Sequence, residues 1–299
     1  MIVVFGSLNA DLIFAMQDLP EPGQTLLARS LRIEPGGKGA NQALAAARDG
    51  AEVAMVGAVG ADHMGDLALG NLREAGVDMS RVVRVEEATG CAVILTDGEG
   101  RNMITVASGA NGAARAAQAD DALLARKPVV LAQMEGLADE VAAFLARASA
   151  HGCRTILNLA PAIWLDEAAL RRCSLLVVNE TEAAEVASWV GTAATAAGLR
   201  RALGIDVLRT MGAEGSEAST LAEGEIRVAA PKLRAVDTSA AGDCFIGFLA
   251  SALDRGAPLK TAMTRATQAA ALACMRLGSQ SSIPWAAEVD AAAAPPAPK

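Results

Sequence analysis

Short apolar segments rich in β-branched residues recur along this chain and alternate with alanine-rich segments of helical spacing. The strand-length runs lie at 2–5, 53–56, 129–131, 155–157, 175–178 and 207–208. The helical segments include 40–48, 66–75, 139–150 and 181–190. Such alternation predicts βαβ units that build a mainly parallel sheet covered by helices on both faces.

Two segments interrupt this alternation and predict a second, smaller sheet. Residues 12–33 form an extended run broken by prolines, and residues 91–106 have the pattern of a hairpin with its turn at 97–100. We expect them to pair as a small antiparallel sheet that serves as a lid. The predicted division is a body of 1–11, 34–90 and 107–290, a lid of 12–33 and 91–106, and a disordered, low-complexity tail of 291–299.

Composition excludes several classes of protein. Hydrophobic residues make up 52% and charged residues 20% of the chain, which is typical of a globular protein and not of a disordered one. A formal net charge of −8 without a basic stripe argues against a nucleic-acid partner. No apolar run approaches the roughly 18 to 20 residues that cross a bilayer, and the first residues lack the features of a secretory signal. We therefore expect a cytoplasmic, enzyme-sized protein with no membrane partner.

The cysteines and histidines do not form a recognisable catalytic or metal-binding pattern. The five cysteines are scattered, and the two histidines lie far from any serine or cysteine motif. Neither a hydrolytic triad nor a zinc site with cysteine or histidine ligands is expected. The chemistry is therefore expected to depend on carboxylates, amides, backbone groups and bound ions.

A glycine-rich segment, PGGKGANQA at 35–43, precedes an alanine-rich helix. Its glycines allow the backbone to approach a ligand closely, and Lys38 stands among them in front of the helix. The spacing of a P-loop, G-x-x-x-x-G-K-[ST], is absent. A tight turn before a helix explains the glycines equally well, so this segment alone does not decide between structure and function.

A second segment combines small residues with two carboxylates at the start of a helix. Ala240, Ala241 and Gly242 leave backbone N–H groups unobstructed at the positive end of that helix, which suits a phosphate or an oxyanion. Asp243 stands at the helix start, and Asp237 lies just before it. An N-capping aspartate is the structural alternative. A cap requires neither the small residues nor the second carboxylate, so we favour a functional site.

Further polar residues stand where predicted strands end, which is where open α/β sheets bind ligands. They are Asn9, Asp11, Gln133 and Glu135, with the segments 179–182 and 210–216. At 179–182, capping of the next helix is an equally good interpretation. Together, the carboxylates, amides and single lysine suit a small molecule with many hydroxyl groups.

Two motifs in this order, GGKGANQA at 36–43 and DTSAAGD at 237–243, make the chain resemble the carbohydrate kinase family of ribokinase type (PfkB-like). The resemblance extends from residue 2 to about residue 285. It implies an α/β, ribokinase-like three-layer sandwich with a mainly parallel central sheet and a small β-sheet lid. It also implies a phosphotransferase that uses ATP, Mg²⁺ and an activating K⁺, with an alcohol group as acceptor.

The resemblance also implies a role for each matching residue. Asp243 is the implied catalytic base, and Ala240, Ala241 and Gly242 form an anion hole. The implied sugar-binding residues are Asn9, Asp11, Gly37, Lys38, Asn41, Glu135 and Asp243. The implied nucleotide-side residues are Asn179, Thr210, Gly212, Gly215, Gly242 and Thr267, with Glu182 helping indirectly to organise Mg²⁺. The implied K⁺ site consists of Asp237, Ser239, Ala273, Arg276, Gly278 and Ser282.

The chain departs from the family pattern at three places. Ser239 replaces a frequent threonine, which preserves the cation site if the main-chain carbonyl is the ligand. Thr267 stands near where an asparagine is expected beside the adenine, which puts that contact in doubt. The segment Asn158-Leu-Ala-Pro161 replaces the usual N-P-A-P, a change expected to affect a turn more than the chemistry.

The expected reaction is transfer of the ATP γ-phosphate to the 5-hydroxyl of D-ribose. A nucleoside kinase is one alternative, although aromatic residues are only 3% of the chain and tyrosine is absent. A kinase of another sugar or of a sugar acid is a second, for which Arg29 or Arg101 could bind the acid. A catalytically silent, sugar-binding regulatory protein is a third, against which the intact Asp243 and anion-hole residues argue. Exposed lid strands imply a homodimer formed through the lid.

Overall fold

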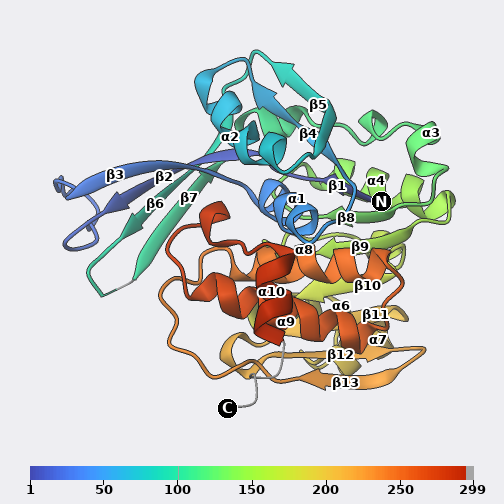
Figure 1. The fold of residues 1–299 in the computed structure, drawn as a ribbon. Helices are drawn as coiled ribbons and strands as arrows, with labels where there is room; N and C mark the ends of the chain where they lie inside the picture. The colour runs from blue at the N-terminus through green and yellow to red at the C-terminus, as the bar shows by residue number, and fades with distance from the viewer. Residues whose placement is uncertain (100, 294–299) are drawn as a thin grey trace.

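The computed structural model describes residues 1–99 and 101–293, which form an α/β body and a smaller sheet (Figure 1). The body contains a nine-stranded sheet in which neighbours run parallel from β5 to β11, and β12 and β13 are added antiparallel. Its strands, in spatial order, are β13 (Gly224–Val228), β12 (Ser216–Thr220), β11 (Asp206–Thr210), β10 (Leu175–Val178), β9 (Arg154–Asn158), β8 (Val129–Ala132), β1 (Ile2–Phe5), β4 (Val53–Gly60) and β5 (Asp78–Val85).

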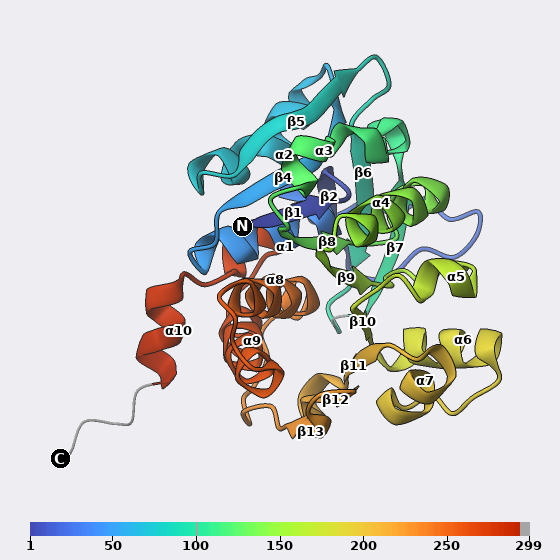
Figure 2. The same ribbon diagram turned by 90° about the vertical axis from the view of Figure 1, so that its right-hand side faces the viewer.

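Helices cover both faces of this sheet (Figure 2). They are α1 (Lys38–Arg48), α2 (His63–Glu74), α3 (Asp121–Leu124), α4 (Ala138–Ala150), α5 (Glu167–Leu170), α6 (Glu180–Val190), α7 (Ala196–Leu203), α8 (Ala241–Asp254), α9 (Leu259–Cys274) and α10 (Ala286–Ala293). Ile2 and Val4 of β1 pack into one apolar core with α1, α2, α8 and α9, whereas Val3 and Phe5 pack into another with α4, α6 and α7. The two cores confirm the predicted three-layer sandwich.

The smaller sheet projects from the body (Figure 1). Its strands, in spatial order, are β3 (Ser30–Gly36), β2 (Asn9–Ala15), β6 (Gly90–Thr96) and β7 (Asn102–Ala107). The outer pairs are antiparallel, and β6 and β7 form the predicted hairpin, although Gly100 of its turn lies outside the described residues. The central pair β2–β6 is parallel, so the prediction of an antiparallel sheet is wrong at that pair. Asn9 pairs with Gly90 because both strands leave the body at the same place.

Three strands and part of a helix differ from the sequence-based expectation. Strands β5 and β13 form the two edges of the central sheet, and β12 lies next to β13. All three carry charged or small polar residues, so no long apolar run marks them. Helix α10 extends to Ala293 and thus includes 291–293 of the segment predicted to be disordered, because alanine favours helix. The remainder of that segment, 294–299, lies outside the described residues. Within the described part of the chain, no helix has the length and apolarity needed to cross a bilayer.

Candidate active site

Two adjoining cavities lie where the carboxyl ends of the central strands meet the small sheet. The larger has a volume of about 820 Å³ and lies between the small sheet and the body. The smaller has a volume of about 110 Å³ and lies beside the ends of β9, β10 and β11. Lys38, Ser239 and Asp243 line both cavities. These three residues therefore mark the boundary between the two compartments.

All the residues predicted to bind the sugar line the larger cavity. They are Asn9, Asp11, Gly37, Lys38, Asn41, Glu135 and Asp243. Asn9 and Asp11 lie on β2, so they belong to the small sheet and not to the body, which was predicted to include residue 11. The chain leaves β1 at Phe5 and enters β2 at Asn9, which brings both side chains into the small sheet.

The first turn of α1 is closed by protein groups. Gly37 has a φ of 89°, and a Cβ at this position would lie 2.9 Å from the Ser7 carbonyl oxygen, so a side chain does not fit. The Lys38 N–H donates to Glu135 Oε2 (3.0 Å), and the Gly39 N–H donates to Ser7 Oγ (3.2 Å). Ser7 Oγ in turn donates to Glu135 Oε2 (2.6 Å). The helix begins at Lys38, not after it as predicted, because Glu135 and Ser7 take the place of an N-cap side chain.

The first turn of α8 is open. The Ala241 N–H donates to the Thr238 carbonyl oxygen (3.2 Å), with Ala240 as the residue before the helix. The N–H groups of Gly242 and Asp243 have no hydrogen-bond acceptor in the part of the chain that the structure describes. A Cβ built on Gly242 would meet no atom within 4 Å. Of the residues predicted to form an anion hole, Gly242 therefore has an available amide at the positive end of the helix and the Ala241 amide is already bonded, while the Asp243 amide beside them is also available.

Amide side chains hold the Asp243 carboxylate from the α1 side. Asn41 Nδ2 donates to Oδ2 (2.9 Å), and Gln42 Nε2 donates to Oδ1 (2.8 Å). Gln42 Nε2 also donates to Asn158 Oδ1 (3.0 Å) at the end of β9. Asp243 is 8% exposed, so the carboxylate is confined to one position while it still lines both cavities.

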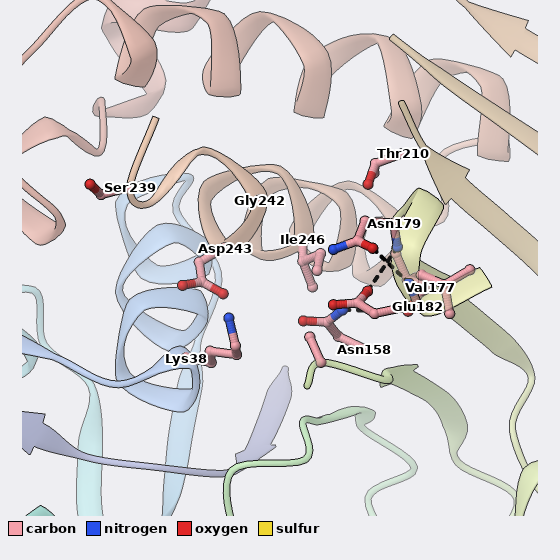
Figure 3. Close-up of a pocket in the computed structure, with 12 residues that line it drawn as sticks. Lys38, Asn158, Val177, Asn179, Glu182, Thr210, Ser239, Gly242, Asp243 and Ile246 are labelled. Atoms are coloured by element: carbon pink, nitrogen blue, oxygen red, sulfur yellow. Dashed lines mark hydrogen bonds between the residues drawn. The ribbon is translucent and has the colours of Figure 1, made fainter. Parts of the chain in front are cut away.

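Several carboxylates line the larger cavity together with Lys38, Arg29 and Arg32. Burial, together with the negative charges of Glu135 and Asp243, raises the pKa of Asp11 to about 7. The charge of Asp243 raises the pKa of Lys38 and outweighs the opposite effect of burial, so Lys38 is an ammonium ion. Figure 3 shows this ammonium group directed towards the Asp243 carboxylate. The carboxylates provide acceptors for hydroxyl groups, and the Lys38 ammonium group provides a positive charge for an anion.

Asn179 and Glu182 form a capping box at the start of α6. The Glu182 N–H donates to Asn179 Oδ1 (2.9 Å), and the Asn179 N–H donates to Glu182 Oε2 (2.8 Å). Both residues also line the smaller cavity, together with Thr210 (Figure 3). Burial raises the pKa of Glu182. The cap thus fixes a buried carboxylate at the cavity wall, and the two interpretations of this motif are compatible.

Three residues predicted on the nucleotide side lie outside both cavities. Gly212 begins a short 3₁₀ helix, Gly212–Glu214. Gly215 has a φ of 101°, and a Cβ there would lie 2.1 Å from the Val228 carbonyl oxygen, so packing against β13 already requires glycine. Thr267 is 7% exposed within α9, and its Oγ1 has no hydrogen-bond partner among the described residues. A nucleotide-binding role for these three residues stays a prediction.

The predicted cation site spans the loop before α8 and the segment after α9. Asp237 joins the two, because its Oδ1 accepts from the Ser239 N–H (2.9 Å) and Oγ (2.5 Å) and its Oδ2 accepts from the Gly278 N–H (3.0 Å). Burial disfavours the charged form of Asp237, but these hydrogen bonds outweigh it and hold the pKa below its usual value.

The other residues of this predicted site are engaged within the protein. The Ala273 carbonyl oxygen accepts from the Arg276 N–H (3.1 Å), and Ser282 Oγ donates to the Ser279 carbonyl oxygen (2.8 Å). The Arg276 guanidinium pairs with Glu288. Within residues 1–99 and 101–293, no three His, Cys, Asp or Glu side chains gather as a metal-binding group. Any cation here would therefore depend on backbone and hydroxyl oxygens beside Asp237.

Gln42 and Asn158 belong to the site, although no sequence pattern assigned them to it. Gln42 is completely buried in α1. Apart from Asn41, the residues from Gly39 to Ala46 around it are glycine, alanine or leucine. A buried amide on an otherwise apolar helix is the signal that could have identified it. Asn158 ends a strand, as Thr210 does, and the same strand-end argument could have included it.

Comparisons with known proteins agree with this geometry. A model of the pfkB family carbohydrate kinases matches residues 1–286. Ribokinase of Schizosaccharomyces pombe is 34% identical over 310 residues, covering 97% of this chain and 96% of the relative. Deoxyribokinase of Salmonella typhi is 34% identical over 292 residues, covering 95% of each.

A solved structure gives the same result in three dimensions. The structure of Arabidopsis thaliana ribokinase complexed with ribose and ATP is 29% identical in sequence and matches with a TM-score of 0.87, covering 97% of each chain. The similarity thus extends over nearly the whole of both chains. The chain therefore belongs to the pfkB family of carbohydrate kinases and is a phosphotransferase that uses an alcohol group as its acceptor.

Proposed function

We propose that this kinase transfers the γ-phosphoryl group of ATP to the 5-hydroxyl of D-ribose, with Asp243 as the general base. One observation carries the proposal: Asp243 and Lys38 line both cavities. A sugar in the larger cavity and the end of a nucleotide in the smaller one would meet at these two side chains. The relative complexed with ribose and ATP supports this pair of ligands.

In the proposed reaction the 5-hydroxyl oxygen forms a bond to the γ-phosphorus as the bond from that phosphorus to the departing ADP oxygen breaks. The hydroxyl proton passes to the Asp243 carboxylate, a contribution of roughly 10² to 10⁴ in rate. Negative charge spreads over the oxygens of the moving group in a loose transition state. The Gly242 and Asp243 amides and the Lys38 ammonium would stabilise that charge.

Two cations belong to the proposal. The oxygen atoms of Glu182 and Asn179 at the wall of the smaller cavity suit Mg²⁺, directly or through water, and Mg²⁺ would neutralise phosphate charge. For K⁺, the ionised Asp237 and the oxygens near Ser239 and Gly278 provide a purely oxygen-based environment. This loop leads directly into the open end of α8, so ordering it would order the anion hole.

The cavity lining and the relatives bear on the alternatives to D-ribose. No aromatic side chain of residues 1–99 or 101–293 lines either cavity, which argues against a nucleoside base. For a sugar acid, Arg29 lines the larger cavity, but the Arg101 guanidinium is paired with Asp97. 2-Deoxyribose is the second candidate, because the deoxyribokinase relative is as similar to this chain as the ribokinase relative.

A turnover assay tests the proposal directly. The purified chain would be assayed with ATP and Mg²⁺ against D-ribose, 2-deoxy-D-ribose, D-fructose, inosine and a sugar acid, each with and without K⁺. We expect the highest kcat/KM with D-ribose and a higher rate when K⁺ is present. NMR of the product should show the phosphate at the 5-position. A higher kcat/KM for any other acceptor would contradict the proposed substrate, and turnover independent of K⁺ would contradict the cation site.

The outer face of the small sheet supports a homodimer. Arg32 and Ile104 line the larger cavity, so their strand neighbours Leu31, Ile33 and Met103 point the other way. These three side chains are 49%, 46% and 50% exposed. Pairing of two such faces would cover them and the sheet edges. Sedimentation at micromolar concentration is expected to show a dimer, and a single monomeric species would contradict it.

A further inference from the structure

We propose that Gln42 is a positioning residue for phosphoryl transfer: it fixes the orientation of the Asp243 carboxylate that receives the hydroxyl proton. The inference rests on the proposed function, because it assumes that Asp243 is the base. Gln42 is 0% exposed and lines neither cavity. It therefore does not reach the sugar or the nucleotide, and an effect on the reaction must pass through the cavity-lining residues that it contacts, Asp243 and Asn158.

Hydrogen bonds determine which way the Gln42 amide points. An ionised carboxylate only accepts hydrogen bonds, so the Gln42 nitrogen, and not its oxygen, must face Asp243. The nitrogen uses its two protons on Asp243 Oδ1 (2.8 Å) and Asn158 Oδ1 (3.0 Å). The oxygen accepts from Gln133 Nε2 (2.6 Å). A flipped amide would lose all three bonds and place an oxygen against the carboxylate.

Gln133 is itself held in place. It follows β8, is 1% exposed, and lies so close to Gly6 that a Cβ on that glycine would be 2.0 Å from its Oε1. The Gln133–Gln42–Asp243 chain therefore links the end of β8 to α1 and to α8. Helix α1 also carries Lys38 and Asn41, which line the larger cavity. Gln42 thereby fixes the proposed base relative to the helix that carries residues predicted to bind the sugar.

The first test separates turnover from binding. Gln42→Leu keeps the approximate volume and removes the donor. We expect kcat to fall about 10- to 100-fold, the range for a hydrogen bond to a charged group, while KM for sugar and for ATP changes by less than about threefold. A loss confined to KM, or a kcat within about twofold of the wild type, would overturn the inference.

The second test asks whether Gln42 acts through Asp243. In an Asp243→Asn background the base is already absent, so adding Gln42→Leu should lower the residual kcat by less than about threefold. If Gln42→Leu lowered kcat in the Asp243→Asn background by the same factor as in the wild type, its role would be generally structural and the inference would be overturned. Wild-type enzyme inactive on every sugar would instead overturn the proposed function, which distinguishes the two failures.

Two further variants control for folding. Gln118 is a matched glutamine away from the site, with its Nε2 donating to the Gly57 and Arg81 carbonyl oxygens and its Oε1 accepting from the Arg115 N–H. Gln118→Leu should lower the melting temperature and leave kcat within about twofold. Gln133→Leu removes the lock on the Gln42 amide without touching Asp243, so it remains informative if Gln42→Leu does not fold. It should lower kcat about 3- to 10-fold with KM unchanged, and an unchanged kcat would overturn the inference.

Discussion

Helices α1 and α8 both have glycine and alanine around their first turns beside the cavities, yet their first amides are used in opposite ways. In α1, Glu135 and Ser7 accept from the first N–H groups, and Gly37 is needed because its backbone has a positive φ and no room for a Cβ. In α8, Gly242 has open space around it, and its N–H has no acceptor among the described residues. A glycine at a helix start therefore indicates an anion site only where the protein itself leaves the amides unbonded.

The largest effect that this comparison predicts is at Asp243, in the open turn of α8. Asp243→Asn preserves the shape of the side chain and removes the proton acceptor, so kcat should fall roughly 10²- to 10⁴-fold. Steady-state kinetics with ATP and sugar would measure it, with thermal unfolding as the check on folding. Turnover within about tenfold of the wild type would show that the base lies elsewhere.

Gly242→Ala tests whether the open turn of α8 is open for a ligand. A Cβ there meets no protein atom, so the variant should fold normally and gain up to about 1 kcal/mol in the free energy of unfolding from better helix propensity. The same methyl group would obstruct the approach of a phosphate, and kcat should fall about 10- to 100-fold. A stable variant with normal kcat would mean that no anion approaches this amide.

Gly37→Ala is the matched substitution at the closed turn of α1. Here the φ of 89° and the 2.9 Å approach to Ser7 predict a loss of about 1 to 3 kcal/mol in the free energy of unfolding. Denaturant unfolding of the two alanine variants side by side would measure the contrast. If Gly37→Ala were as stable as Gly242→Ala, the steric explanation of the closed turn would fail.

The smallest expected effect concerns pH and the sugar side of the site. The pKa of Asp11 is raised to about 7, so its carboxyl group becomes protonated as the pH falls from 8 to 6 and loses an acceptor for sugar hydroxyls. We expect kcat/KM for sugar to fall by at most about tenfold in total over this range, and KM for ATP to stay nearly constant. An unchanged profile in Asp11→Asn would exclude Asp11 as the cause.

The same shift has a consequence for stability, with a definite sign. Because the folded-state pKa of Asp11 lies above its unfolded value of 3.8, the folded protein binds more protons between about pH 4 and 7. Ionisation of Asp11 therefore lowers the free energy of unfolding as the pH rises through this range. Asp11→Asn should remove this contribution, which a pH series of denaturant unfolding curves would detect.

Much of the fold follows from the sequence, because the central strands are buried on both faces and read as continuous apolar runs. Leu175–Val178 is such a strand, with every residue buried. The edge strands lack this signal: β5 exposes Asp78 and Arg84, and β13 exposes Gly224, Glu225 and Arg227. The parallel pairing of β2 with β6 depends on where two distant segments leave the body, which no local pattern records.

The site is predictable where polar residues follow a predicted strand, as for Asp11 and Glu135, and where a helix begins with small residues and a carboxylate, as for Asp243. Partners are harder to predict, because they depend on three-dimensional distances. Glu135 was predicted to bind sugar, and its contacts to Ser7 and to the Lys38 N–H are invisible in the sequence. The hydrogen bond from Gln42 to Asp243 joins residues 201 positions apart.

The placement of Asn9 and Asp11 on β2 has a practical consequence for engineering. These side chains are part of the four-stranded sheet, in register with Gly36 and Glu34 of β3. A chimera that exchanges this sheet with that of a relative would therefore also exchange Asp11, a carboxylate predicted to bind the sugar. The preference for one sugar over another should therefore change with the exchanged strands, while Gly242 and Asp243 on α8 continue to determine phosphoryl transfer.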